Sequence, residues 1–294
     1  MLYIAPLLWL GNPTQRFGYA DDIALVAFST NLQMNCDQLQ SDLQEALTWG
    51  ESEGITFDPL KSELLHFSRS HKDANADLPG VTTRTHSVTE GNGPLRWLGV
   101  YFDRKLSFKQ HVQILSTKAL VVGNTLKFLG KMTCGVSLKL LQQAITACVL
   151  KKGYYAAETW WPGRFRQSSA GRISNRIEAH TQLLEKVTYN GARAILPAYR
   201  TTPTLALLKE SQILPPEIQL NLASQTFTAR TAHLDPYHPL RKRADKITKA
   251  GKPTSRFARW ILALPWSKTV NLITRPLWKA CEDCNSIMQQ ISSP

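Results

Sequence analysis

Two adjacent carboxylates, Asp21 and Asp22, stand between apolar stretches of the chain. Like charges side by side repel each other and are costly to desolvate, so a cation nearby would stabilise the pair. Carboxylate oxygens are hard ligands that suit Mg²⁺ and metal-bound nucleotide phosphates. The dipeptide therefore indicates a candidate metal site, although a solvated acidic turn would have the same two residues.

The neighbouring residues predict the elements that would position the pair. Residues 15–19 and 23–28 favour two strands, which would place the carboxylates at the tip of a hairpin. Apolar residues recur at helical spacing over 32–49, and Gly50 is expected to end that helix. We expect this helix to pack across the hairpin, and residues 1–8 to form the end of an earlier helix.

The following segments predict further short strands. Gly54 and the Asp58-Pro59 pair indicate a turn, and residues 62–68 alternate as a strand would, with Lys61 at its start. Residues 70–94 are polar and predict a surface loop, with one short strand near Val81. Residues 95–108 then predict a strand, a bend at Gly99 and a turn.

Three of these segments together resemble the reverse transcriptases of non-LTR retrotransposons. The run Tyr19-Ala20-Asp21-Asp22 between apolar strands resembles their polymerase motif. The segment from Asp58 to Glu63 is similar to the one that follows that motif, and the run Arg96-Trp97-Leu98-Gly99-Val100 resembles the primer-grip hairpin. The resemblance extends over residues 1–240.

The resemblance implies an α+β fold. Residues 1–106 would form a partial polymerase palm, an antiparallel sheet with a packed helix. Residues 107–240 would form an all-α basic thumb, and residues 241–294 a basic C-terminal tail. Helices are predicted over 108–132, 137–150, 173–196, 205–211 and 217–233. The first and third show an apolar face at helical spacing, and prolines mark the start of the last two. The cations from Arg241 onward are expected on a solvated tail that contacts phosphates.

The same resemblance implies RNA-directed DNA polymerase activity with two Mg²⁺ ions. Its partners would be an RNA template, a DNA primer and a dNTP. Asp21 would bridge the metals and Asp22 would assist, while Lys61 would protonate the departing pyrophosphate. Contacts to primer or nucleotide are expected from Tyr19, Ala20, Arg96, Trp97, Leu98 and Gly99. Contacts to the nucleic-acid backbone are expected from Lys109, Lys118, Lys127, Lys131, Arg164 and Arg166.

Charge and cysteine content agree with such a protein. Residues 1–100 carry six Lys and Arg against twelve Asp and Glu, whereas the other 194 residues carry 29 against ten. An acidic part with metal ligands and a basic part suit a metal-dependent enzyme acting on a polyanion, although a generic basic surface would give the same excess. Five scattered cysteines favour a reducing intracellular compartment, nuclear or cytoplasmic, without a disulfide-linked partner.

Three other motifs bear on metal binding, membrane binding and nucleic-acid binding. Cys281 and Cys284 have the spacing of half a zinc site, but no second pair lies near them in sequence, so ordinary thiols are expected. The apolar start of the chain is broken by Pro6 and is too short to span a bilayer, so no membrane partner is expected. The aromatic residues between Tyr154 and Arg164 fit either stacking on nucleic acid or packing between helices.

One departure from the family pattern concerns activity. The family's fingers and the palm strand with the other metal-binding aspartate lie upstream of the Asp-Asp hairpin, and 20 residues precede Asp21 here. We therefore expect a truncated palm and no polymerase activity from the isolated chain. The alternative is a non-enzymatic remnant whose basic helices bind RNA or DNA.

Overall fold

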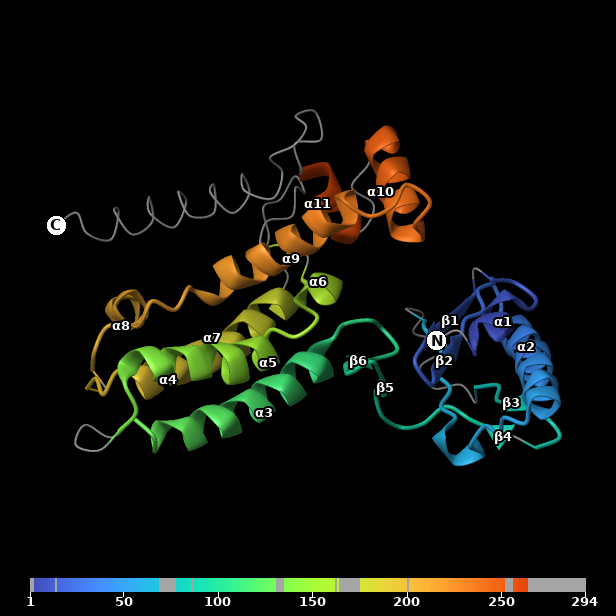
Figure 1. The fold of residues 1–294 in the computed structure, drawn as a ribbon, viewed down its shortest axis with the longest axis horizontal. Coiled ribbons are helices and arrows are strands. Elements are labelled where there is room, and N and C mark those ends of the chain that lie inside the picture. Colours follow the sequence, from blue (N-terminus) through green and yellow to red (C-terminus); the bar gives the residue numbers. More distant parts are fainter. Residues whose placement is uncertain are drawn as a thin grey trace. The chain divides into compact units, whose positions relative to one another are not determined.

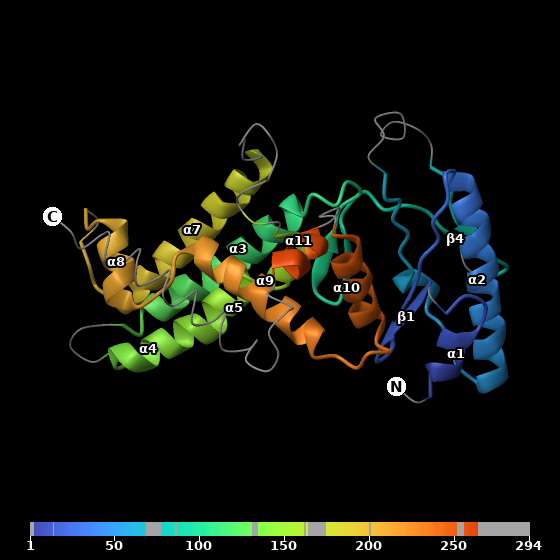
Figure 2. The same cartoon turned by 90° about the horizontal axis from the view of Figure 1, so that it is seen from above.

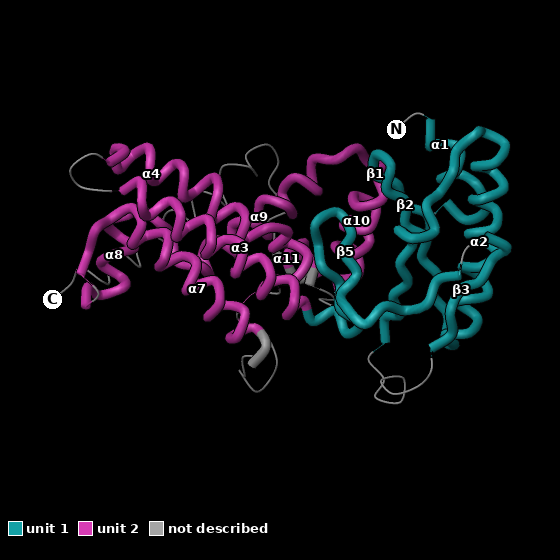
Figure 3. The backbone as a smooth tube through the Cα atoms, turned by 90° about the horizontal axis from the view of Figure 1, so that it is seen from below, with its two compact units in different colours: residues 1–107 teal, residues 108–294 magenta. Residues whose placement is uncertain are grey.

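The chain divides into two compact units after Ser107, each of which is described here by itself (Figures 1 and 3). The structure is a computed structural model. It describes residues 3–13, 15–68, 78–85, 87–130, 135–161, 163, 175–199, 201–251 and 256–263.

The first unit begins with a short helix and the acidic hairpin. Helix α1 (Ala5–Trp9) precedes strands β1 (Arg16–Tyr19) and β2 (Asp22–Leu25), which pair antiparallel from Arg16 opposite Leu25 to Tyr19 opposite Asp22. The predicted hairpin is confirmed, but β2 already starts at Asp22 and ends at Leu25. The turn is tight because Ala20 adopts a left-handed conformation, with φ of 55°.

Helix α2 (Leu32–Glu53) packs against the hairpin, as predicted. Asn31 caps its start, since the Asn31 side chain accepts a hydrogen bond from the Gln33 amide. The prediction that Gly50 ends the helix is wrong: Gly54, with φ of 72°, does so. A Cβ at position 50 would stand 2.8 Å from the Phe57 ring and 2.9 Å from the Ile55 carbonyl oxygen. Gly50 is therefore explained by close packing inside the helix.

Short elements complete the first unit. They are the 3₁₀ turn η1 (Pro59–Lys61) and the strand pairs β3 (Val81–Thr82) with β4 (Ser87–Val88) and β5 (Leu95–Trp97) with β6 (Val100–Phe102). The predicted strand over 62–68 is wrong, because Leu64 makes only an isolated bridge to Glu90. This segment is held instead by buried His66, whose Nε2 lies 2.9 Å from the Pro79 carbonyl oxygen.

The second unit is helical where the structure describes it. Its elements are α3 (Lys109–Lys127), α4 (Leu138–Ala144), the π-helical turn η3 (Ile145–Leu150), α5 (Lys151–Gly153), α6 (Ala157–Trp160), α7 (Asn175–Ile195), α8 (Thr204–Ser211), α9 (Pro216–Ala232), α10 (Pro239–Ala250) and α11 (Arg256–Ala263). Helix α3 lies along α7, and α4 and α5 lie beside them (Figure 2). Helices occupy all five predicted ranges where the structure describes them, whereas the predicted residues 131–132 and 173–174 lie outside the described residues.

The core of the second unit consists of apolar side chains that recur at helical spacing. Helices α3 and α7 pack against each other, and Val112 and Ala119 of α3 and Leu184 and Val187 of α7 are almost fully buried. Gly153 permits the close approach of α5, because a Cβ there would lie 3.2 Å from Val187. A helix at a protein surface buries one apolar face, so apolar residues at helical spacing in the sequence indicate such a helix.

The region predicted as a solvated basic tail differs in the structure. Helices α10 and α11 occupy its described part and pack against α9. Ala244 of α10 and Ala258 and Ile261 of α11 are fully buried. The apolar positions between the cations therefore form a packed face, so this segment belongs to the helical unit through residue 263. The remaining predicted tail lies outside the described residues.

In the part of the chain that the structure describes, no helix is long and apolar enough to cross a membrane. Cys36 is a buried free thiol and Cys148 an exposed one.

Candidate active site

The tip of the β1–β2 hairpin presents both carboxylates to solvent. Asp21 lies in the turn, and Asp22 is the first residue of β2, directly opposite Tyr19. Asp21 and Asp22 are exposed, and Tyr19 is 57% exposed. The structure thus brings Tyr19, Ala20, Asp21 and Asp22 together within one tight turn, as the sequence predicted.

The two faces of this hairpin have different surroundings. Side chains alternate along a strand, so Phe17, Tyr19 and Asp22 share one face, while Arg16 and Gly18 belong to the other. On the second face a Cβ at Gly18 would stand 3.0 Å from the Leu8 side chain, which shows how closely α1 approaches. Phe17 on the first face is 47% exposed. The face with Tyr19 and Asp22 is therefore the one accessible to a ligand.

Arg16 fixes the covered face of the hairpin to both helices. Its guanidinium donates to the Leu7 carbonyl of α1 at 3.2 Å and pairs with Asp42 of α2 at 3.2 Å and with Glu45. The Arg16 side chain is only 1% exposed and that of Asp42 8%. Because a buried ion pair is directional, this cluster sets the position of β1 relative to the two helices.

Sequence reasoning missed Arg16. A signal was nevertheless present, because Arg16 is the only Lys or Arg among the first 60 residues, where acidic side chains are frequent. A lone cation in an acidic segment is a reasonable candidate for a structural ion pair.

The donor set at the hairpin tip is chemically suited to Mg²⁺ but small. Asp21 and Asp22 supply carboxylate oxygens, the ligand type that Mg²⁺ prefers. Among the described residues, no three His, Cys, Asp or Glu side chains gather closely enough to hold a metal ion. The described part of the chain therefore offers two carboxylates at this position and no third metal-binding side chain.

Lys61 lies at the end of the η1 turn, with 84% of its side chain exposed. Its Nζ is 3.8 Å from the Asp58 carboxylate, an exposed pair that contributes little to stability. The ion pair described for Lys61 is thus local, and its proposed contact with pyrophosphate stays a prediction.

The β5–β6 hairpin carries the predicted primer-grip residues. Its turn is formed by Leu98 and Gly99, with φ of 48° and 79°, so the expected bend at Gly99 is confirmed. Arg96 is exposed, and its guanidinium carbon lies 5.9 Å from the centre of the Tyr101 ring. Trp97 is half-buried, and its indole N–H has no hydrogen-bond partner among the described residues. The hairpin exposes a cation while its tryptophan packs inward.

The structure describes only some of the residues in the second unit that were predicted to contact the nucleic-acid backbone. Lys109, Lys118 and Lys127 are exposed on α3. Lys131, Arg164 and Arg166 lie outside the described residues.

The aromatic cluster after α5 serves packing. Trp160 and Trp161 are 2% and 1% exposed and meet edge to face, with ring centres 6.3 Å apart. The Trp161 indole donates to the Asn221 side chain of α9 at 2.7 Å. Of the two interpretations left open by the sequence, packing between helices is correct for these two side chains, because neither ring is accessible to a base.

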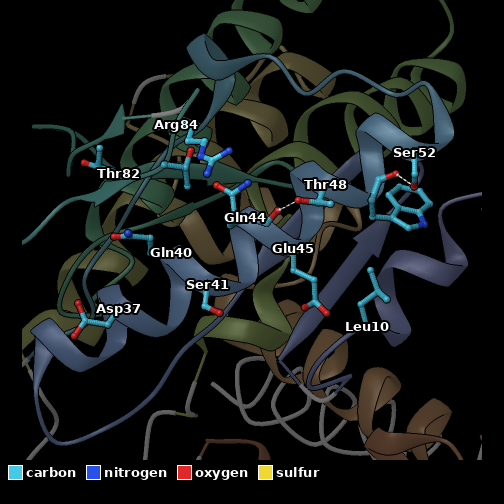
Figure 4. Close-up of a pocket in the computed structure, with 12 residues that line it drawn as sticks. Leu10, Asp37, Gln40, Ser41, Gln44, Glu45, Thr48, Ser52, Thr82 and Arg84 are labelled. Atoms are coloured by element: carbon cyan, nitrogen blue, oxygen red, sulfur yellow. Dashed lines mark hydrogen bonds between the residues drawn. The ribbon is translucent and has the colours of Figure 1, made fainter.

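A groove of about 830 Å³ lies elsewhere on the first unit, along α2 (Figure 4). Its lining includes Gln40, Gln44 and Thr48 of α2, and Arg84 after β3. None of the site residues predicted from the sequence lines it. Glu45 lines the groove and also pairs with Arg16, which lies at the end of the hairpin opposite the acidic tip.

Comparison with known proteins gives one informative similarity. No family model and no solved structure matches the chain. Over 97 residues, a third of the chain, it is 31% identical to an RNA-directed DNA polymerase from the mobile element jockey of Drosophila funebris. The chain spans about a tenth of the length of that relative. This similarity supports a relationship to the reverse transcriptases of non-LTR retrotransposons.

Proposed function

We propose that this chain contributes part of the palm and the thumb of an RNA-directed DNA polymerase, with Asp21 and Asp22 as metal-binding residues. The observation that carries the proposal is the hairpin tip, where two adjacent exposed carboxylates lie beside Tyr19 on the accessible face. The opposite face is fixed by the buried Arg16 cluster. Ligands held on a rigid element can be positioned accurately for catalysis.

Each side chain of the proposed site has a defined task. Asp21 and Asp22 would hold Mg²⁺, which when bound supplies positive charge to neutralise phosphate oxygens. Tyr19, on the same face as Asp22, would contact the primer end or the incoming nucleotide. Exposed Lys61 would donate a proton to pyrophosphate, and the turn at Leu98 and Gly99 would support the primer.

The isolated chain is expected not to polymerise. Two carboxylates on adjacent residues give fewer protein ligands than a tightly bound metal requires, and the described residues supply no third one nearby. We expect weak metal binding at the hairpin and no template-dependent extension by the 294-residue chain alone. Processive synthesis by this chain would contradict that expectation.

A metal-binding experiment tests the site in the chain as it exists. Mn²⁺ added to the protein should broaden the NMR signals of residues 17–24, and the double variant Asp21→Asn/Asp22→Asn should abolish the broadening. Asp37→Asn, an exposed carboxylate on α2, is the matched control and should leave it unchanged. Equal broadening in all variants would show that the hairpin does not bind the ion.

A chimera tests polymerisation itself. The chain would replace the corresponding segment of the jockey polymerase, and primer extension on an RNA template would be measured with Mg²⁺. We expect extension that Asp21→Asn abolishes and Asp37→Asn preserves. An extending chimera that is indifferent to Asp21→Asn would refute the proposed role.

A second function is favoured by the charge of the other unit. The excess of Lys and Arg after residue 100, with exposed lysines along α3, suits a nucleic-acid-binding protein without catalysis. Salt-sensitive RNA binding combined with a chimera that never extends a primer would support this alternative.

A further inference from the structure

Helix α10 has a strongly basic face on the side opposite its buried residue Ala244. At about 100° per residue, its cations Lys242, Arg243, Lys246 and Lys249 fall within roughly 120° of the helix circumference. All four are exposed, and Ala244, which lies on the opposite side, is fully buried. We name these four residues the α10 basic face.

Helix α10 carries one carboxylate, Asp245, against five cations, so this face keeps an excess of positive charge. Asp245 accepts from Arg241 one turn earlier, with 3.1 Å between Nε and the nearer carboxylate oxygen, and both side chains are part-buried beside the basic face. Lysines at i, i+4 and i+7 repel one another when nothing compensates them. The arrangement therefore favours a bound polyanion over an empty surface.

An exposed aromatic ring adjoins the basic face. Tyr237 precedes α10 and is 80% exposed, and Lys242 Nζ lies 5.4 Å from the centre of its ring. The Tyr237 amide donates to the Asp235 carboxylate at 2.7 Å, which fixes the backbone that carries the ring. An aromatic ring beside a row of cations is the combination with which proteins bind single-stranded nucleic acid, since bases stack while cations contact phosphates.

We propose that α10 and Tyr237 form a binding surface for single-stranded nucleic acid, with phosphates on the α10 basic face and a base stacked on Tyr237. The three lysines span about 10 Å along the helix axis, enough for two or three phosphates. The surface lies outside the hairpin site. The proposal rests on the proposed function only for the choice of RNA as the probe.

A membrane surface fits α10 less well. Peripheral helices bury an apolar face in the lipid boundary. The side of α10 that holds Ala244 is instead packed within the protein, where α10 meets α9 and α11 (Figures 1 and 2). That apolar side exposes part of Leu240 but buries Ala244, so the exposed cations are the main feature that α10 presents to a ligand and suit phosphates along a nucleic-acid backbone.

The test compares two charge-matched variants of the full chain. One is Lys242→Gln/Lys246→Gln/Lys249→Gln, and the control is Lys151→Gln/Lys152→Gln/Lys209→Gln, which removes three exposed lysines elsewhere in the same unit. Binding of a fluorescein-labelled 15-nucleotide single-stranded RNA would be measured by anisotropy without Mg²⁺ at several salt concentrations. Omitting Mg²⁺ separates this test from the metal site proposed at the hairpin, because no ion is then present to bind there.

We expect the α10 variant to bind about tenfold more weakly, with a salt slope smaller by about 2, as three lost phosphate contacts would give. The control should change affinity less than twofold. Replacing the three lysines by arginine should restore binding, and circular dichroism should show the same helix content in all variants. Equal losses in the α10 variant and the control would overturn the proposal, because they would mean that only net charge matters.

Tyr237→Ala provides the second criterion. It should weaken binding of the single strand by about tenfold, in line with the loss of one stacked base, and leave a 15-base-pair RNA duplex unaffected. Tyr237→Phe should bind like the natural protein. No effect of Tyr237→Ala on the single strand, or preferential binding of phosphatidylserine vesicles by the α10 basic face, would overturn the assignment.

Discussion

Arg16→Ala is expected to loosen the first unit more than any other single change at the hairpin. The substitution leaves Asp42 without its cation, although the Asp42 side chain is only 8% exposed. Breaking a buried ion pair by removing one partner typically costs about 3–5 kcal/mol. Asp42 keeps a hydrogen bond from Gln38 at 3.2 Å, so we expect the lower end of that range.

Hydrogen exchange followed by mass spectrometry measures this loss in the full chain. A destabilisation of about 3 kcal/mol should speed exchange of the protected amides of 32–53 by roughly 100-fold, because about 1.4 kcal/mol corresponds to a factor of ten. Peptides from α3, which belongs to the other unit, are the internal control and should exchange as before.

Two companion variants identify the cause. Arg16→Ala/Asp42→Asn should recover about 2 kcal/mol relative to Arg16→Ala, since the double variant no longer buries an unpaired charge. Glu45→Gln should cost less than about 1 kcal/mol, because the Glu45 side chain is 43% exposed and solvent screens its pairing. If Arg16→Ala changed exchange by less than about fivefold, the buried pair would not hold the hairpin in place and our reasoning would be refuted.

Two further predictions concern glycine packing and pH. Gly50→Ala should destabilise the first unit by about 1–3 kcal/mol, because the new Cβ would stand 2.9 Å from the Ile55 backbone carbonyl oxygen. Gly18→Ala should cost less, because the flexible Leu8 side chain can move away from the new Cβ. Similar free energies of unfolding for the two variants in denaturant would contradict this difference. Burial lowers the pKa of His111, and this outweighs the opposing effect of the Tyr155 carbonyl. The unfolded state then binds the proton more readily, so stability of the second unit is complete above about pH 6.5 and is lost as the pH falls further. Thermal unfolding between pH 7.5 and 5 should show this loss, and His111→Gln, which can still donate to the Tyr155 carbonyl, should reduce it; an unchanged pH dependence would exclude His111 as the group responsible.

Local patterns in the sequence determined most of the elements. The acidic hairpin was predictable because apolar strand residues flank a two-residue turn, α3 and α7 because their apolar positions recur at helical spacing, and α9 because Pro215 and Pro216 stand at its start. The same local reasoning found the turn at Leu98 and Gly99. The exposure of Asp21 and Asp22 followed from their place at a hairpin tip, since charged turn residues stay in water unless a partner buries them.

Tertiary contacts decided the remaining features. Gly50 was mistaken for a helix end because the ring and carbonyl that require a glycine come from residues after the helix. The partners of Arg16 lie 9, 26 and 29 residues away, and packing on α9 gave Trp161 a structural role. Periodicity describes neighbours along the chain, whereas ion pairs, close approaches and burial depend on which distant segments meet. The sequence by itself therefore determined the elements and the position of the carboxylates, and the tertiary structure decided which face of the hairpin is accessible.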